Sequence, residues 1–403
     1  MRSDTRRRLA LLAFGVLLAL LAVEASVRLI EPRSGLRESF ETSDLVLHHR
    51  LIPGAHGRHR HPEFEVPYDI NALGLRDLEL SREKPAGTKR ILFLGDSFTE
   101  GWGVTATETF TSQLRGLLDA SGLRTPWQIV NAGVAGYSPL LEYLYLKNAG
   151  ATLQPDLVIV CFDMSDVFDD IQFTSQAELA ANGEPVAVPV TPMLQAGSWP
   201  ADLLLPLKNL MKEHVETYGF IRRRLTNYEA STELTDDVLG DLRFDKYGMF
   251  REELGPQDDR AWSKSYEYLL KIRDFLSARG IDFWITVHPY GLQVSPREWP
   301  GRELLRFKPG QVYSAHPQEL VVDFGRRNSI PVVNMVPDFR DASRAVFPLY
   351  YNRDGHWRAA GHRVAAEALH KALIPYLRTR DASSMGAAPR SGQGSNTSGI
   401  RHE

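Results

Sequence analysis

The sequence predicts a three-layer α/β/α sandwich built on a mainly parallel sheet. From residue 89 onward, apolar strand-like runs alternate with helix-like segments, and this alternation is typical of a parallel sheet with helices on both faces. Polar and glycine-rich turns follow several of these runs, where open α/β sheets bind ligands. Strands are expected at 90–95, 127–132, 156–162, 282–288 and 331–335. Helices are expected near 107–120, 139–150, 258–279, 316–328 and 358–377.

Two of these elements are the most clearly patterned. The continuous apolar run from Ile91 to Leu94 indicates a buried strand. The segment 258–279 has apolar residues at helical spacing, which predicts one buried face. Those residues are Tyr268, Leu269, Ile272, Phe275 and Leu276.

Composition excludes several classes of protein. The 403 residues are 43% hydrophobic and 24% charged, as in globular proteins. The net charge of −3 gives no indication of a nucleic-acid partner. The single cysteine, Cys161, excludes an internal disulfide and lies in an apolar run, which predicts a buried side chain.

The first thirty residues predict a signal for export. Arg2 and Arg6–Arg8 precede the uncharged run Leu9–Val23, which reaches a membrane-spanning length only if it continues to Ile30. We interpret residues 1–30 as a transmembrane signal anchor, with the arginines in the cytoplasm and the catalytic part periplasmic or extracellular. A signal peptide cleaved within Val23–Ala25 is the alternative.

The remaining boundaries follow composition. Residues 31–88 are interpreted as a linker and irregular N-terminal extension, 89–378 as the main domain, and 379–403 as a disordered tail. An insertion, 173–257, interrupts the alternation and is either a lid or substrate wall or a structural excursion. Its Arg222–Arg224 cluster is expected to be solvated.

The chemistry-bearing residues lie at both ends of the main domain. Ser97 follows the first strand, where backbone N–H groups of a starting helix can stabilise an oxyanion. In the segment Asp354–Trp357, His356 can act as general base and Asp354 can fix its tautomer. The three side chains are the parts of an activated serine nucleophile.

Two further motifs lie between them, a glycine-rich turn at Asn131–Ser138 and the segment Cys161–Asp166. The order Gly-Asp-Ser, Asn-x-Gly-x-x-Gly, Asp-x-Ser-Asp and Asp-x-His resembles the SGNH/GDSL hydrolase superfamily over about residues 66–377. This resemblance implies a flavodoxin-like three-layer fold and Ser97 as nucleophile. It also implies an oxyanion hole formed by the backbone N–H groups of Ser97 and Gly136, with Ser165 at the position of a third donor.

The chain departs from the family pattern at two positions. Ser165 replaces an asparagine, and loss of one oxyanion donor typically costs about 10²–10³ in rate. Arg353 occupies the usual position of the acid, so Asp354 stands two residues before His356 instead of three. The resulting Asp-x-His-Trp arrangement resembles polysaccharide O-acetyltransferases.

Other candidates have simpler interpretations beside the functional ones. Trp102 either lines a substrate pocket or packs in the core, and His288 either contacts substrate or is a structural histidine. Five histidines between residues 48 and 61 are expected in a solvated loop, because their spacing does not match a metal site. They are His48, His49, His56, His59 and His61.

The sequence therefore predicts a serine-dependent acyl-ester hydrolase that needs no metal or organic cofactor. Its expected substrates are O-acyl groups on a polysaccharide or envelope glycan. An O-acetyltransferase with the same residues is one alternative, and a non-catalytic protein that binds a glycan or a protein partner is another.

Overall fold

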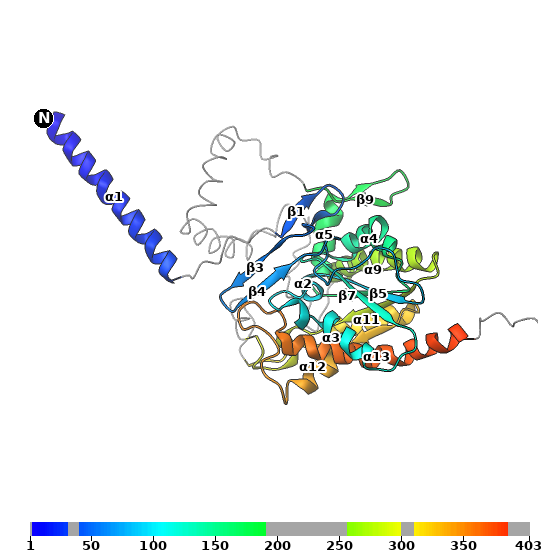
Figure 1. The fold of residues 1–403 in the computed structure, drawn as a ribbon. Coiled ribbons are helices and arrows are strands. Elements are labelled where there is room, and N and C mark those ends of the chain that lie inside the picture. Colours follow the sequence, from blue (N-terminus) through cyan, green and yellow to red (C-terminus); the bar gives the residue numbers. More distant parts are fainter. Residues whose placement is uncertain (1, 31–39, 191–255, 300–309, 386–403) are drawn as a thin grey trace, which may run out of the picture.

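The computed structural model describes residues 2–30, 40–190, 256–299 and 310–385. A five-stranded parallel sheet forms the centre of the main domain (Figure 1), with the strand order β11-β10-β7-β5-β6. The strands are β5 (Lys89–Gly95), β6 (Trp127–Gly133), β7 (Leu157–Phe162), β10 (Asp282–Val287) and β11 (Val332–Asn334). In chain order this is the 2-1-3-4-5 arrangement of a doubly wound sheet, whose ligand crevice lies at the carboxyl ends of the first and third strands. The predicted parallel α/β sheet is confirmed.

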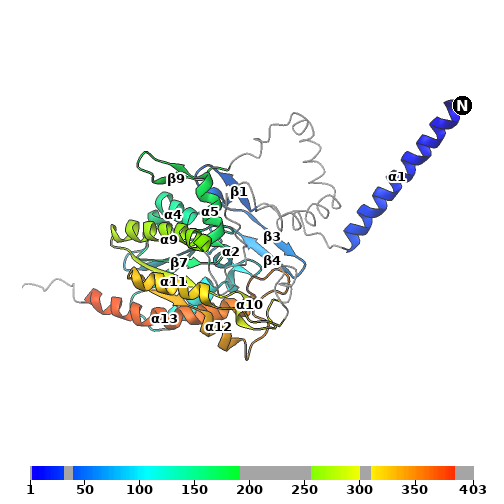
Figure 2. The ribbon, with the colours of Figure 1, turned by 180° about the vertical axis from the view of Figure 1, so that it is seen from behind.

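Helices cover both faces of this sheet. On one face α13 packs against α3 and α12. On the other face α9 packs against α4 and α5, with α11 beside it (Figure 2). These helices are α3 (Phe110–Asp119), α4 (Pro139–Asn148), α5 (Asp166–Gln176), α9 (Pro256–Ser277), α11 (His316–Arg327), α12 (Val336–Ala342) and α13 (Ala359–Met385). Short elements are α2 (Ser97–Glu100), α10 (Gly291–Val294), η1 (Ala106–Glu108), η2 (Gly150–Leu153), β8 (Glu178–Leu179) and β9 (Pro185–Ala187).

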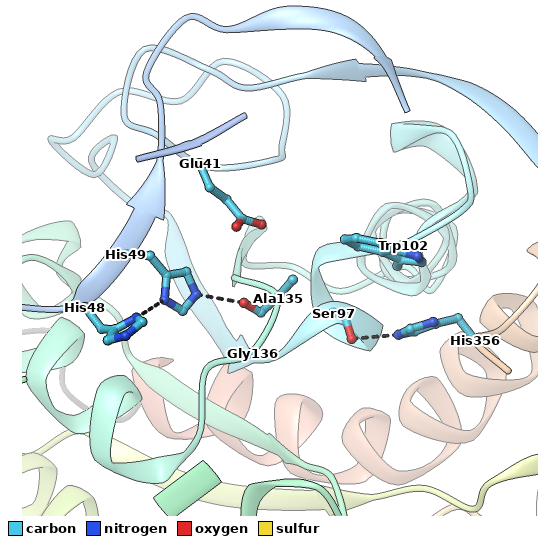
Figure 3. Close-up of a pocket in the computed structure, with 8 residues that line it drawn as sticks. All are labelled: Glu41, His48, His49, Ser97, Trp102, Ala135, Gly136 and His356. Atoms are coloured by element: carbon cyan, nitrogen blue, oxygen red, sulfur yellow. Dashed lines mark hydrogen bonds between the residues drawn. The ribbon is translucent and has the colours of Figure 1, made fainter. Parts of the chain in front are cut away.

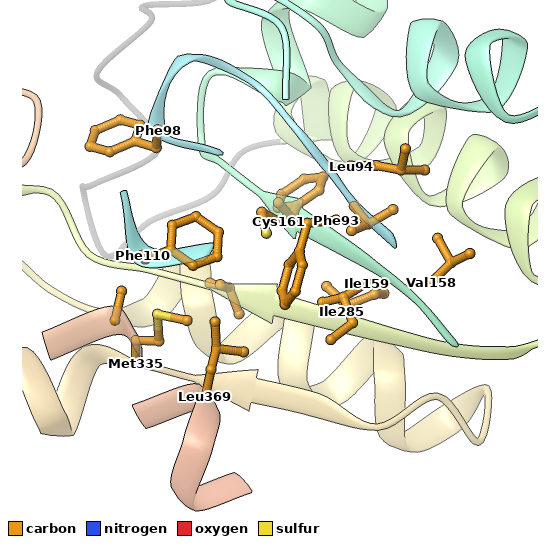
Figure 4. Close-up of a cluster of buried hydrophobic side chains, with 14 of the residues drawn as sticks. Phe93, Leu94, Phe98, Phe110, Val158, Ile159, Cys161, Ile285, Met335 and Leu369 are labelled. Atoms are coloured by element: carbon orange, nitrogen blue, oxygen red, sulfur yellow. The ribbon is translucent and has the colours of Figure 1, made fainter. Parts of the chain in front are cut away.

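The central strands are apolar along their whole length because helices cover them on both sides. Every residue of β7 is buried, including Cys161, as predicted. Figure 4 shows Phe93 and Ile159 of adjacent strands in this core, together with Phe110 of α3 and Leu369 of α13. Burial of each such side chain contributes about 1.5–3 kcal/mol, so the core fixes the strands whose ends carry the site.

The N-terminal extension contains two regular hairpins over residues 41–69, where an irregular segment was expected, while residues 70–88 contain no helix or strand. β1 (Glu41–Asp44) pairs with β2 (His48–Leu51), and β3 (His56–His61) pairs with β4 (Phe64–Asp69), both antiparallel. Alternate side chains of the second hairpin are buried, among them His59, Phe64 and Tyr68. The histidines and arginines concealed this two-residue period, because they are also common in loops.

The two terminal segments and the predicted insertion can be compared with the expectations from sequence. α1 (Arg2–Ile30) is one helix. Among the described residues, no helix combines enough length with enough apolar character to cross a membrane. α13 continues to Met385, so the first residues of the predicted disordered tail are helical. Most of the predicted insertion, including Arg222–Arg224, lies outside the described residues.

Candidate active site

Ser97 lies at the sharp turn from β5 into α2. Asp96 caps the helix, its Oδ1 accepting a hydrogen bond from the backbone N–H of Phe98 at 2.9 Å. Gly133 at the end of β6 lets α2 approach closely, since a Cβ there would lie 2.4 Å from the backbone nitrogen of Glu100. The serine is therefore held at the carboxyl edge of the sheet, where the helix begins.

Three side chains form a continuous hydrogen-bonded chain at this edge. Ser97 Oγ lies 2.7 Å from His356 Nε2, and His356 Nδ1 lies 2.6 Å from Asp354 Oδ1. Figure 3 shows the Ser97–His356 contact. Because a carboxylate only accepts, Nδ1 carries a proton and the neutral ring offers its Nε2 lone pair to the Ser97 hydroxyl. This arrangement can deprotonate the serine as it attacks a carbonyl carbon.

The carboxylate of Asp354 is prepared for its role by its neighbours. Burial alone would raise the pKa of Asp354, but the hydrogen bond and positive charge that His356 can supply hold that pKa below its ordinary value. The Trp102 indole N–H also donates to Asp354 Oδ2 at 3.2 Å. Asp354 thus stays ionised beside the ring and can stabilise an imidazolium.

The loop that carries Asp354 is held by a residue from the N-terminal extension. Glu63, in the turn between β3 and β4, accepts hydrogen bonds from the backbone N–H groups of Asn352, Arg353 and Asp354 at 2.8–2.9 Å. Charge-assisted bonds of this kind are about twice as strong as neutral ones. No sequence pattern points to Glu63, because its partners are backbone groups about 290 positions away.

Ser97 lies at an open pocket of about 460 Å³ on the surface of the domain. In Figure 3, Ser97, Trp102 and His356 lie on one side of it, and His48 and His49 lie on the other. The remaining lining residues are Glu41, Ala135 and Gly136. Trp102 and Gly136 thus line the same pocket as Ser97, while a substrate contact by Trp102 and oxyanion donation by Gly136 stay predictions.

Ser165 and His288 do not line this cavity. Ser165 Oγ donates its proton to Asp163 Oδ2 at 2.8 Å, so acting as an oxyanion donor would require that bond to break. His288 is 2% exposed and packs against Phe98 and Trp357. Burial lowers the pKa of His288 to about 4. Of the two alternatives for His288, a substrate contact or a structural histidine, this environment fits the structural one.

The first two histidines of the His-rich segment contribute to the cavity wall instead of lying in a solvated loop. His49 Nε2 lies 2.8 Å from the carbonyl oxygen of Ala135, and His48 Nδ1 lies 3.0 Å from His49 Nδ1. His59 is buried, with its ring 4.2 Å from that of Trp102. No local sequence pattern predicts these positions, because each depends on packing between the hairpins and the main domain.

Behind Ser97 lies a pair of buried carboxyl groups. Burial raises the pKa of Asp96 well above its ordinary value, and the charge of Asp163 and a hydrogen bond with it raise the pKa further. Asp163 also accepts hydrogen bonds from Tyr290 Oη at 2.8 Å and from the backbone of Met164 at 2.6 Å. A protonated Asp96 can therefore donate to Asp163 without placing two charges in the core.

Within the described residues no acid or histidine cluster could hold a metal ion.

Comparisons with protein families agree with this geometry. Residues 93–209 match the GDSL-like lipase/acylhydrolase family, and residues 249–394 match the SGNH hydrolase-like domain of the acetyltransferase AlgX. The comparison with curated proteins gives no match.

Several solved structures are similar in fold. The acetyl xylan esterase AlAXEase is 12% identical over 71% of this chain and 100% of its own, with a TM-score of 0.39. A catalytic mutant of Axe2, an acetylxylan esterase from Geobacillus stearothermophilus, is 14% identical over 72% and 97%, with a TM-score of 0.38. A two-domain esterase active on acetylated mannans is 12% identical over 73% of this chain and 51% of its own, with a TM-score of 0.37. At these TM-scores the likenesses do not bear on the reaction.

The doubly wound parallel sheet with a serine at its ligand crevice places the protein in the α/β class. Within that class, the two family matches support a member of the SGNH/GDSL superfamily whose C-terminal part resembles the SGNH hydrolase-like domain of AlgX.

Proposed function

We propose that this protein is a serine-dependent acyl-ester hydrolase in which Ser97, His356 and Asp354 are the catalytic triad. The observation that carries the proposal is the unbroken hydrogen-bonded chain of these three residues, which opens into a cavity. A neutral imidazole bonded to a serine hydroxyl, with a carboxylate behind it, is suited to acyl transfer.

The proposed reaction has two steps, acylation of Ser97 and hydrolysis of the acyl-enzyme. Ser97 Oγ attacks the ester carbonyl while its proton passes to His356 Nε2, and the imidazolium then protonates the departing alcohol. The acyl group now forms an ester with Ser97. Water, deprotonated by His356, attacks this ester, and the proton returns to Ser97 as the carboxylic acid leaves. Backbone N–H groups of Ser97 and Gly136 stabilise the oxyanion in both steps.

The substrate we propose is an O-acyl group, such as acetyl, on a carbohydrate. The cavity wall opposite the triad is polar, with Glu41, His48 and His49, while Trp102 provides an aromatic face beside His356. Sugars combine hydroxyl groups with apolar C–H faces, so they match a wall of this mixed character.

An O-acetyltransferase is a second candidate, because residues 249–394 match the AlgX acetyltransferase domain. A sugar hydroxyl would replace water in the second step, with the same proton movements. The two reactions differ only in which acceptor reaches the acyl-enzyme.

The full chain and its Ser97→Ala variant test the proposal with p-nitrophenyl acetate. We expect a burst of nitrophenolate and continuing turnover, both falling by about 10⁴ or more in the variant. Added acetyl-free oligosaccharide separates the candidates, since acetylated sugar forms at the expense of acetate only in a transferase. Equal turnover in Ser97→Ala would overturn the role of the serine, and absence of acylation in the parent would favour a non-catalytic binding protein.

We also propose that the N-terminal segment directs the catalytic part across the inner membrane, as an anchor or a cleaved signal. The proposal rests on the arginines before the uncharged run Leu9–Val23. Fractionation of cells that express the full chain should find the domain on the periplasmic side, where external protease reaches it in spheroplasts. Recovery in the cytosol would contradict the proposal.

A further inference from the structure

The peptide that joins Ala135 to Gly136 is the central peptide of a β-turn. Tyr137 N–H donates to the carbonyl of Val134 at 3.0 Å, closing the turn. Gly136, its third residue, has φ +80°, which is the signature of a type II turn. Type I and type II turns differ mainly by a flip of this central peptide, and glycine at the third position makes the type II form accessible. The direction of the Gly136 N–H therefore depends on what holds the peptide.

We propose that His49 is a positioning residue that locks this peptide so that the Gly136 N–H faces the oxyanion formed at Ser97. The inference rests on the proposed acyl transfer at Ser97. His49 Nε2 lies 2.8 Å from the Ala135 carbonyl oxygen (Figure 3), and a carbonyl only accepts, so Nε2 carries the proton. In a trans peptide the C=O and N–H point in opposite directions. A histidine that holds the carbonyl on its own side thus turns the N–H away from itself, toward the side of the pocket where Ser97 lies (Figure 3).

A flipped peptide would place the wrong group at the site. The Ala135 carbonyl would then replace the Gly136 N–H, and its partial negative charge would repel the oxyanion. Removal of one oxyanion donor typically costs about 10²–10³ in rate. The donation of Ser165 Oγ to Asp163 increases the importance of this backbone donor.

The proton on His49 Nε2 is itself fixed by a neighbour. With that proton in place, Nδ1 of the neutral ring is an acceptor, and His48 Nδ1, 3.0 Å away, donates to it. Burial lowers the pKa of His48, which favours its neutral form. His48 therefore selects the tautomer of His49 that can donate to Ala135.

Contacts that do not involve the imidazole hold the surrounding backbone. Tyr137 Oη donates to the His49 carbonyl oxygen at 2.8 Å. Glu100 Oε2 accepts from the Ala135 backbone N–H at 2.5 Å. A change of the His49 side chain should therefore leave β2 in place and release mainly the one peptide.

A matched pair of variants, His49→Gln and His49→Met, tests the lock. The two side chains have similar length and flexibility, but only glutamine can donate to Ala135 from a position close to that of imidazole Nε2. For p-nitrophenyl acetate we expect kcat to fall about 10–100-fold in His49→Met with KM within a few-fold of the parent. We expect kcat in His49→Gln to stay within a few-fold of the parent.

The binding of a transition-state analogue provides a second measurement, which a change in packing alone would not alter. The Ki of a reversible boronic acid, which forms a tetrahedral adduct on Ser97, should rise with the loss of kcat in His49→Met and not in His49→Gln. Thermal unfolding midpoints establish that both variants are folded. Equal kcat in the two folded variants, or failure of His49→Met to fold while His49→Gln loses kcat, would overturn the lock but leave the Ser97 chemistry intact. Absence of Ser97-dependent acylation in the parent would overturn both.

Discussion

Glu63 belongs to the turn between β3 and β4, yet it acts on a loop that lies close to the end of the domain. Its carboxylate accepts hydrogen bonds from the backbone N–H groups of residues 352–354. Three successive N–H groups that point at one carboxylate fix the backbone of the loop. Asp354 then holds His356, so a small shift of the loop would misplace the proposed general base.

Replacement of Glu63 by alanine should lower kcat about 10–100-fold, because Asp354 would no longer be held against His356. Glu63→Gln keeps one acceptor oxygen without charge and should lose less. Steady-state kinetics with p-nitrophenyl acetate measures both. Glu65→Gln is the control, since Glu65 lies on the same hairpin and pairs with exposed Arg58 and Arg60. A control that is as impaired as Glu63→Ala would show that general hairpin stability is the cause.

At the scale of elements, the helices beside the site are joined by buried acids. Asp170 of α5 accepts hydrogen bonds from Ser138 Oγ at 2.7 Å and from the Leu140 backbone N–H at 2.9 Å. These groups belong to the start of α4, so one carboxyl caps a neighbouring helix. Burial raises the pKa of Asp170 to about 6 even though these hydrogen bonds lower it.

This shift predicts a pH dependence of stability. The folded state keeps the Asp170 proton up to about pH 6, while the unfolded chain loses it near pH 4, so Asp170 destabilises the fold progressively as pH rises through this window. Asp170→Asn cannot titrate and retains an acceptor oxygen. Relative to the parent, the variant should gain about 3 kcal/mol of unfolding free energy between pH 4 and pH 7.5.

Urea unfolding at several pH values measures this difference. Asp274→Asn on α9 is the control, because its side chain is exposed. A difference between Asp170→Asn and its parent that stays constant with pH would contradict the assignment of the raised pKa.

At the scale of the whole molecule, the last helix, α13, packs against α3 near the start of the domain. His362 of α13 is fully buried, and its Nδ1 accepts from the Phe110 backbone N–H of α3 at 3.2 Å. Burial, reinforced by the charge of Arg76, lowers the pKa of His362 to about 3. His362 lies six residues after His356. Its contact with Phe110 therefore also anchors the start of α13, directly after the loop that carries Asp354 and His356.

The sign of the expected pH effect is opposite to that of Asp170. Unfolded His362 takes up a proton near pH 6.5 and the folded form does not, so stability falls as pH falls from about 6.5 toward 3. His362→Asn keeps an acceptor for Phe110 and cannot titrate, so its unfolding free energy should fall less steeply with acid. The parent should lose up to about 5 kcal/mol more than the variant across this range.

Acid titration of the unfolding free energy measures the effect, with exposed His56→Asn as control. Parallel curves for the parent and His362→Asn would contradict a buried neutral histidine at this junction.

The sequence alone indicated the sheet, the helices of the main domain and Ser97 and His356 as candidate site residues, which the structure brings together. Local patterns carry that information, because a continuous apolar run records burial on both faces and the turn after it marks the edge where ligands bind. The motif order along the chain then indicated the family, and the two family matches support it.

Tertiary structure alone decided which other residues complete the site. His49 acts on a carbonyl 86 positions away and Glu63 on amides about 290 positions away, and backbone groups have no residue identity that a sequence pattern could reveal. Likewise, the hydroxyl of Ser165 is donated to Asp163, and His288 is buried by aromatic rings from other elements. Short-range periodicity determines what a segment becomes, whereas the partner of each polar group is decided only when distant segments pack together.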